Sequence, residues 1–137
     1  MADVDANICI LLIDDHADTL TLQAMLLRRR GYEVHTAGSV EAARTVAGAQ
    51  RLDLVISDIR LPDGSGLVLL EELRQRFKLP TIAITGLAEQ DAGPEAAAAG
   101  IDRVLVKPIA PDQLIEAVER LLGEADGGAG GGASGAG

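Results

Sequence analysis

Short segments typical of strands, most of them largely apolar, recur along this chain, and helical segments lie between them. These segments cover residues 8–13, 33–37, 52–57, 81–85 and 103–106. A short continuous apolar run indicates a strand that is buried on both faces. Strands that alternate with helices at this spacing imply right-handed crossovers within one parallel sheet. The pattern therefore predicts an α/β fold: a single, doubly wound, five-stranded parallel sheet flanked by five helices.

The helical segments are predicted from apolar residues spaced three and four apart, together with start and stop signals. They cover residues 18–30, 40–49, 66–77, 95–99 and 111–122. Ser39 is a suitable N-cap for the second helix, and Gly31 is a suitable C-cap for the first. The helix at residues 95–99 is expected to be short, because Gly93 and Pro94 interrupt anything longer.

Charge and composition exclude several classes of function. The formal net charge of −9 would repel a polyanion such as DNA, so we expect no nucleic-acid binding by this domain alone. No apolar stretch approaches the ~20 residues of a membrane span, and the acidic N-terminus lacks the regions of a signal peptide. Cys9 is the single cysteine, which fits a reducing compartment. We therefore expect a cytoplasmic protein without a membrane segment.

The length of 137 residues suits one domain, which we expect to cover residues 7–123. Residues 127–137 read GGAGGGASGAG and have almost nothing to bury on folding. We therefore expect residues 124–137 to form a disordered tail or linker rich in glycine and alanine.

Polar residues close the predicted strands and should meet at one edge of the sheet, where open parallel sheets bind their ligands. The residues are Asp14, Asp15, Asp58, Thr85 and Lys107. Gathered carboxylates repel one another, and a divalent cation relieves that repulsion. Carboxylate and carbonyl oxygens suit Mg²⁺, which also accepts water and phosphate oxygens as ligands. With a lysine and a threonine hydroxyl opposite, the set suits phosphoryl transfer in which Asp58 attacks phosphorus.

The order of these motifs resembles the response regulator receiver family of two-component systems, which includes the chemotaxis response regulator. The resemblance rests on the acidic pair, on Asp58 with the LPDGSG segment, on Thr85, and on the Lys107-Pro108 pair. It covers about residues 7–123. It implies a flavodoxin-like strand order of 2-1-3-4-5 and a signalling domain that catalyses only its own phosphorylation and dephosphorylation.

The resemblance implies a role for each residue of the acidic site. Asp58 is the phosphoacceptor for a histidine kinase or a histidine phosphotransfer domain. Asp15 and Asp58 bind Mg²⁺ directly, and Asp14 does so mainly through water. The backbone carbonyl of Arg60 is a further ligand.

The resemblance also implies how a phosphoryl group would be held and sensed. Lys107 and Thr85 hold its oxygens, and a cis peptide bond precedes Pro108. Movement of Thr85 reshapes the face made by the fourth helix, the fifth strand and the fifth helix, through which a homodimer can also form. Val104 stands where the family often has an aromatic switch residue, so a different output mechanism is expected.

Two further positions depart from the family pattern beside the phosphate. Arg60 lies two residues after Asp58, and Leu87 lies two residues after Thr85. A cation and an apolar group at these positions would slow attack by water. We therefore predict a long-lived phosphoryl state.

Alternative interpretations remain for the motifs and for the function. Asp14 and Asp15 could be ordinary acids at a helix start, and His16 is interpreted as a solvent-exposed loop residue, because imidazole prefers softer ions than Mg²⁺. The chain could instead be a receiver-like dimerisation module that is not phosphorylated. An aspartate-nucleophile phosphatase is disfavoured, because Arg60 stands where that class has its second Asp.

Overall fold

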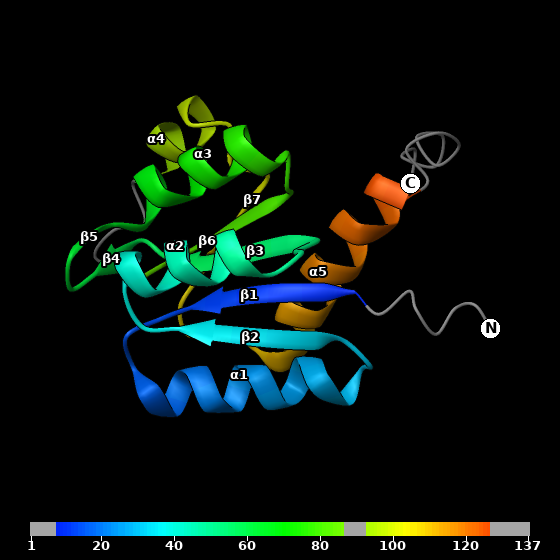
Figure 1. Ribbon diagram of the computed structural model, residues 1–137. Coiled ribbons are helices and arrows are strands. Elements are labelled where there is room, and N and C mark those ends of the chain that lie inside the picture. The colour runs from blue at the N-terminus through cyan, green and yellow to red at the C-terminus, as the bar shows by residue number, and fades with distance from the viewer. Residues whose placement is uncertain (1–7, 87–92, 127–137) are drawn as a thin grey trace.

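The computed structural model describes residues 8–86 and 93–126, which form a sheet between two layers of helices (Figure 1). The elements in order are β1 (Cys9–Ile13), α1 (Ala17–Arg29), β2 (Glu33–Ala37), α2 (Val40–Ala49), β3 (Leu54–Asp58), β4 (Arg60–Leu61), β5 (Gly64–Ser65), α3 (Gly66–Phe77), β6 (Thr81–Thr85), α4 (Gly93–Ala98), β7 (Arg103–Val106) and α5 (Pro111–Asp126). The long strands form a five-stranded sheet in the order β2-β1-β3-β6-β7, and β4 and β5 form a separate hairpin. With the hairpin set aside, this is the predicted order 2-1-3-4-5, and the predicted fold is confirmed.

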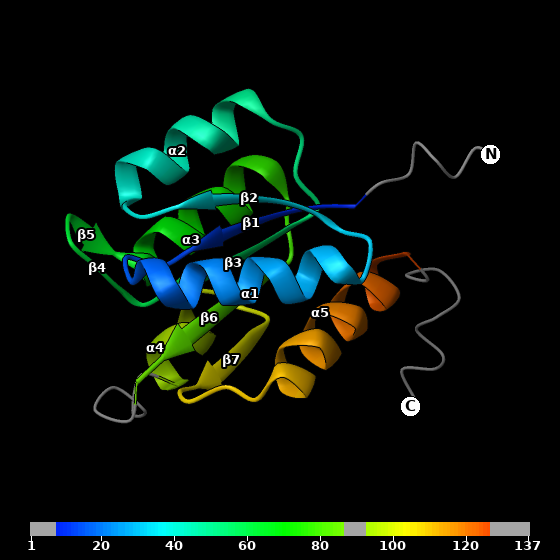
Figure 2. The ribbon, with the colours of Figure 1, turned by 90° about the horizontal axis from the view of Figure 1, so that it is seen from below.

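The central strands are apolar because both of their faces are covered. Every residue of β1, β3 and β6 is buried, and all pairings within the five-stranded sheet are parallel. Side chains alternate between the faces. Ile10 and Leu12 pack in one apolar cluster with residues of α1 and α5, whereas Leu11 and Ile13 pack in a second cluster with residues of α2 and α3. Figure 2 shows α1 and α5 on the same side of the sheet.

A carboxylate from the hairpin region caps α2. Asp63 accepts hydrogen bonds from the backbone N–H groups of Val40 at 2.7 Å and Glu41 at 3.1 Å. These two bonds lower the pKa of the Asp63 carboxyl below its usual value. The Ser39 hydroxyl accepts a hydrogen bond from the N–H of Ala42 at 3.1 Å, as expected for the N-cap. The loop after Asp58 is thereby fixed to the start of a helix.

Several boundaries differ from the predicted ones. Asp58 is the last residue of β3 and does not follow it. The pair Gly93 and Pro94 opens α4, because proline in the first helical turn removes no helical hydrogen bond. α5 continues past residue 122 to Asp126, into the range predicted as a tail, and residues 127–137 lie outside the described part of the chain. No helix in the described ranges is both long enough and apolar enough to cross a membrane.

Candidate functional site

Two buried aspartates lie side by side at the carboxyl edge of the sheet. Asp14 directly follows β1 and Asp58 ends β3, and these strands are neighbours in register, with Ile13 opposite Ser57. Asp14 is only 1% exposed and Asp58 only 6% exposed. Two buried carboxylates this close to each other need compensating positive charge.

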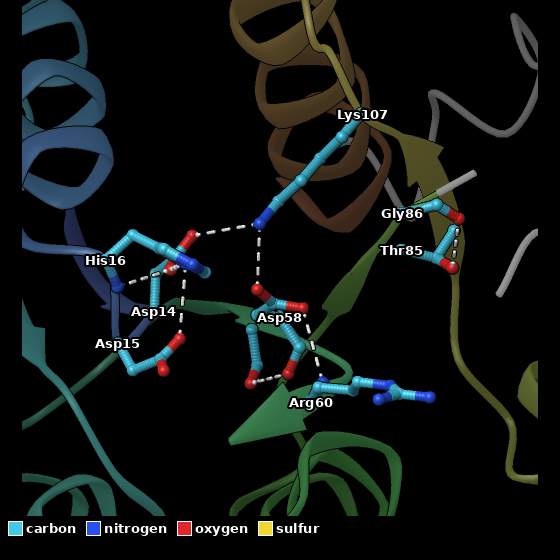
Figure 3. Close-up of polar contacts among 9 residues, drawn as sticks. Asp14, Asp15, His16, Asp58, Arg60, Thr85, Gly86 and Lys107 are labelled. Atoms are coloured by element: carbon cyan, nitrogen blue, oxygen red, sulfur yellow. Dashed lines mark hydrogen bonds and ion pairs between the residues drawn. The ribbon is translucent and has the colours of Figure 1, made fainter. Parts of the chain in front are cut away.

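Lys107 supplies part of that charge from the end of β7. Its ammonium lies 2.9 Å from Oδ2 of Asp58 and 3.6 Å from Oδ2 of Asp14 (Figure 3). The backbone N–H of Lys107 donates to the carbonyl of Thr85 at 2.8 Å, which fixes the start of the side chain against β6. The peptide bond between Lys107 and Pro108 is cis.

The environment of Lys107 keeps the lysine protonated. Burial is the largest single influence and favours the neutral amine, but the hydrogen bonds and charges of Asp58 and Asp14 together outweigh it. The pKa of Lys107 is therefore raised above its usual value of 10.5. The ammonium is a permanent cation of this site at neutral pH.

The acidic pair has a third neighbour in His16, which is an exposed loop residue as predicted. His16 has an exposed side chain, but its ring Nδ1 lies 3.0 Å from Oδ1 of Asp14 and 3.3 Å from Oδ1 of Asp15. Its backbone N–H also donates to Oδ1 of Asp14 at 2.9 Å. The available sequence signal was its position directly after two acids that follow a strand.

The donor atoms at this edge suit a divalent cation. One ligand atom each from Asp14, Asp15, His16 and Asp58 lies within 4.8 Å of the others. In addition, Oδ2 of Asp14 is buried and makes no hydrogen bond. A buried carboxylate oxygen without a hydrogen-bond donor is costly, and a bound cation would satisfy it. This acidic cluster therefore fits a metal ion.

The backbone around Asp58 is held tightly by contacts that the sequence analysis did not identify. Arg60 donates its backbone N–H to Oδ1 of Asp58 at 3.2 Å, and the hydroxyl of Ser57 donates to the carbonyl of Asp58 at 2.9 Å. Gly66 lies so close that a Cβ atom there would be 1.9 Å from the carbonyl oxygen of Asp58. The second glycine of the GSG segment was the only sequence signal for this close approach.

The hydroxyl of Thr85 is hydrogen-bonded to its neighbour Gly86 and not to Asp58 in the described part of the chain. Thr85 is buried at the end of β6, and its hydroxyl donates to the carbonyl of Gly86 at 3.2 Å (Figure 3).

Val104 is partly buried in β7 and packs against the apolar cluster beneath α2 and α3. Leu87 lies outside the described residues. A solvent-accessible cavity of about 320 Å³ opens over Asp58 and Lys107.

The fold and this site together define a doubly wound α/β domain with an acidic, lysine-containing pocket at the switch point of its sheet. A family model described as "Response regulator receiver domain" matches residues 10–119. The chain therefore belongs to the response regulator receiver domain family of two-component signalling.

Individual relatives support this assignment. The response regulator protein PilR of Pseudomonas aeruginosa is 34% identical over 113 residues, which are 82% of this chain and 25% of PilR. The transcriptional regulatory protein SrrA of Staphylococcus aureus is 29% identical over 82% of this chain and 47% of SrrA. The chain thus spans at most about half the length of these relatives.

Solved structures agree with the fold. The CheY-like response regulator receiver domain protein of Methanospirillum hungatei superposes with a TM-score of 0.83 and 29% identity. That match covers 88% of this chain and 97% of the other.

Proposed function

We propose that the chain accepts a phosphoryl group onto Asp58 and thereby switches a surface that binds a protein partner. The observation that carries this proposal is the 2.9 Å hydrogen bond from Lys107 to Asp58 beside the acidic cluster. A nucleophilic carboxylate needs positive charge around it to receive a phosphoryl group, which brings further negative charge. Lys107 supplies part of that charge, and a cation at the acidic cluster would supply the rest. The cavity above Asp58 admits the donor.

Each residue has a defined part in the proposed transfer. A carboxylate oxygen of Asp58 forms a bond to phosphorus while the bond to the donor nitrogen breaks, and the donor imidazole keeps that electron pair. Lys107 pairs with an oxygen of the transferred group. The hydroxyl of Thr85 reaches another oxygen after it leaves the carbonyl of Gly86.

We propose Mg²⁺ as the resident ion. Asp15 and Asp58 would bind it directly, Asp14 mainly through water, and the backbone carbonyl of Arg60 would be a further ligand. When bound, Mg²⁺ neutralises the charge of the carboxylates and of the phosphate. The hydrogen bond from the N–H of Arg60 to Asp58 supports this arrangement, because it fixes this backbone beside the carboxylate.

The proposed donor is the phosphohistidine of a histidine kinase or of a histidine phosphotransfer domain. An apolar surface beside the site suits such a protein. Leu22 and Met25 of α1 are 54% and 43% exposed. A cavity of about 550 Å³ between α1 and the start of α5 is lined by Leu22 and also by Lys107. Gln23 lines this cavity with a buried Oε1 that makes no hydrogen bond, so a partner could donate one to it.

For the output, we propose that the face made by α4, β7 and α5 changes when Thr85 moves, and that a second copy of the chain can bind there. Val104 in β7 is not aromatic, so packing changes around this smaller side chain would replace an aromatic swing. The domain is proposed to cover residues 7–123, with residues 124–137 as a tail or linker whose first three residues continue α5, and to work in the cytoplasm. It is proposed to catalyse only its own phosphorylation and dephosphorylation.

We also propose a long-lived phosphoryl group, because Arg60 borders the cavity over Asp58 and would hinder attack by water. Leu87, the second residue invoked for this property, lies outside the described residues. A half-life of seconds in the absence of any phosphatase would contradict this.

Phosphorylation by a small donor tests the proposed function. The chain is incubated with acetyl phosphate and Mg²⁺, and its intact mass is measured. We expect the mass gain of one phosphoryl group, which disappears with Asp58→Asn or with a chelator and persists in the control Asp112→Asn. No gain in the unchanged chain would favour the dimerisation module that is not phosphorylated.

A further inference from the structure

A short hairpin follows the proposed phosphoacceptor, and its tip is attached to α2. Strand β4 begins at Arg60, two residues after Asp58, and Arg60 lies opposite Ser65 of β5. Pro62 and Asp63 form the turn between the two strands. Figure 1 shows this hairpin beside the start of α2. The hairpin therefore has its base at the acidic cluster and its tip against a helix.

Asp63 makes the attachment through its carboxylate. Oδ1 accepts a hydrogen bond from the N–H of Val40 at 2.7 Å, and Oδ2 accepts one from the N–H of Glu41 at 3.1 Å. Both donors belong to the first turn of α2, where backbone N–H groups have no partner within the helix. A negative charge is also favoured at this end of the helix dipole. The two bonds hold the side chain in place although Asp63 is exposed.

Packing of the hairpin on α2 accompanies these hydrogen bonds. A Cβ atom at Gly64 would lie 3.2 Å from Cγ2 of Val40, and Leu61 is buried in the same apolar cluster as Val40. The chain that leads into α2 is bonded to the acidic cluster in turn, because the N–H of Asp14 donates to the carbonyl of Ala37 at 3.1 Å. The start of α2 is therefore a fixed support for the tip of the hairpin.

The base of the hairpin contains the backbone carbonyl that is proposed as a metal ligand. The N–H of Arg60 donates to Oδ1 of Asp58 at 3.2 Å, and the N–H of Gly66 donates to the carbonyl of Ile59 at 2.7 Å. The hairpin is only two residue pairs long. A displacement of its tip would consequently reach Arg60 and change where the carbonyl lies.

We propose that Asp63 is a positioning residue for metal binding, because its hydrogen bonds to α2 hold the hairpin that carries the carbonyl of Arg60. This inference rests on the proposed function, which supplies the Mg²⁺ and the role of that carbonyl. Asp63 would act through the backbone and not as a ligand. Loss of its carboxylate should therefore lower the affinity for Mg²⁺ and leave the phosphorylation rate at saturating Mg²⁺ nearly unchanged.

Three variants separate positioning from a general loss of stability. Asp63→Ala removes both hydrogen bonds, whereas Asp63→Asn keeps an oxygen acceptor and is a comparable partner for a helix start. Asp53→Ala is the matched control. Asp53 also accepts a hydrogen bond from the backbone of a distant segment, the N–H of Cys9 at 2.8 Å, but it precedes β3 and lies at the opposite end of that strand from Asp58.

The affinity for MgCl₂ is measured by calorimetry for the full chain and each variant, and the rate of phosphorylation by acetyl phosphate is measured over a range of Mg²⁺ concentrations. We expect Asp63→Ala to bind Mg²⁺ about tenfold more weakly, Asp63→Asn to stay within about threefold of the unchanged chain, and Asp53→Ala to bind it equally well. Unaltered affinity in Asp63→Ala, or an equal loss in Asp53→Ala, would overturn the proposal.

Hydrogen exchange of the Arg60 N–H gives a second measurement that needs no metal. Nuclear magnetic resonance of the chain without Mg²⁺ should show faster exchange of this group in Asp63→Ala and no change in Asp53→Ala. An unaltered exchange rate in Asp63→Ala would also overturn the proposal. Failure of the proposed function has a different signature. The unchanged chain would then neither bind Mg²⁺ nor gain a phosphoryl group, while the effect of Asp63→Ala on the exchange of Arg60 persisted.

Discussion

Lys107 donates a 2.9 Å hydrogen bond to Oδ2 of Asp58 across the width of β6. The two residues are 49 positions apart in the sequence and end different strands of one sheet. The bond places a cation on the residue that we propose as phosphoacceptor. In the proposed transfer, Lys107 would exchange this hydrogen bond for one to an oxygen of the phosphoryl group.

Removal of Lys107 should destabilise the chain most when no divalent ion is present. In Lys107→Ala the charges of Asp58 and Asp14 lose their nearest cation, which should cost about 1–2 kcal/mol of unfolding free energy for this partly exposed pair. Added Mg²⁺ should recover part of the loss, because it binds only the folded site. Urea unfolding with and without Mg²⁺ measures both effects. Lys78→Ala, which changes the chain's other lysine, should show no greater response to Mg²⁺ than the unchanged chain.

The same ion pair predicts how the free energy of unfolding changes with pH. The pKa of Lys107 is higher in the folded chain than its usual value of 10.5, so the folded chain holds the proton more tightly. The stabilisation is complete below the unfolded-state pKa and disappears as the pH rises through the folded-state pKa. The stability difference between the unchanged chain and Lys107→Gln should therefore be constant near neutral pH and shrink only above about pH 10. If the stability difference instead shrank between about pH 6 and pH 8, the pH dependence would come from another titrating group and not from Lys107.

A methyl group at residue 66 should disturb the site from the backbone side. A Cβ atom at Gly66 would lie 1.9 Å from the carbonyl oxygen of Asp58, a backbone atom that cannot move without shifting β3. We expect Gly66→Ala to cost about 2–4 kcal/mol of unfolding free energy and to slow phosphorylation. Gly48→Ala is the matched control, since nothing lies within 4 Å of a Cβ there and Gly48 is in α2. It should be neutral or stabilising by up to about 1 kcal/mol. Equal stability of the two variants would refute the packing argument.

A charge introduced at Leu22 should slow phosphoryl transfer from a protein donor but not from a small-molecule donor. Leu22→Glu places a carboxylate on the exposed apolar surface of α1, which we propose as the docking surface of the donor protein. Transfer from a phosphorylated histidine phosphotransfer domain should fall by about tenfold or more, whereas phosphorylation by acetyl phosphate should be unchanged. Val68→Glu, at a similarly exposed apolar residue of α3, should leave both rates unaffected. Loss of both reactions in Leu22→Glu would indicate damage to the fold.

The main features of the fold could be predicted because local pattern and tertiary environment agree in them. Continuous apolar runs such as β1 and β6 occur where both faces of a strand are covered, and each run ends where polar groups gather at the edge of the sheet. From the sequence alone this rule predicts that Asp14, Asp58 and Lys107 lie close together, and the structure places Lys107 within ion-pair distance of both aspartates.

The remaining features depend on contacts that no local pattern encodes. The hydrogen bond from the Thr85 hydroxyl to Gly86 could not be predicted, because the position of a residue at a strand end does not determine its side-chain rotamer. The contact between Gly66 and Asp58 requires the path of the hairpin, which the turn-rich segment alone did not reveal. The contact of the exposed His16 ring with Asp14 and Asp15 depends on the relative placement of these three side chains, which their order in the sequence does not specify.

The most direct test of the central claim is to locate the phosphoryl group on the chain. Borohydride reduction converts an aspartyl phosphate to homoserine, and peptide mass spectrometry then identifies the changed residue. After treatment with a phosphodonor and Mg²⁺, we predict conversion at Asp58, and none at Asp14, Asp15 or Asp63. Conversion at any other aspartate, or none at all in a chain that binds the metal, would contradict the account.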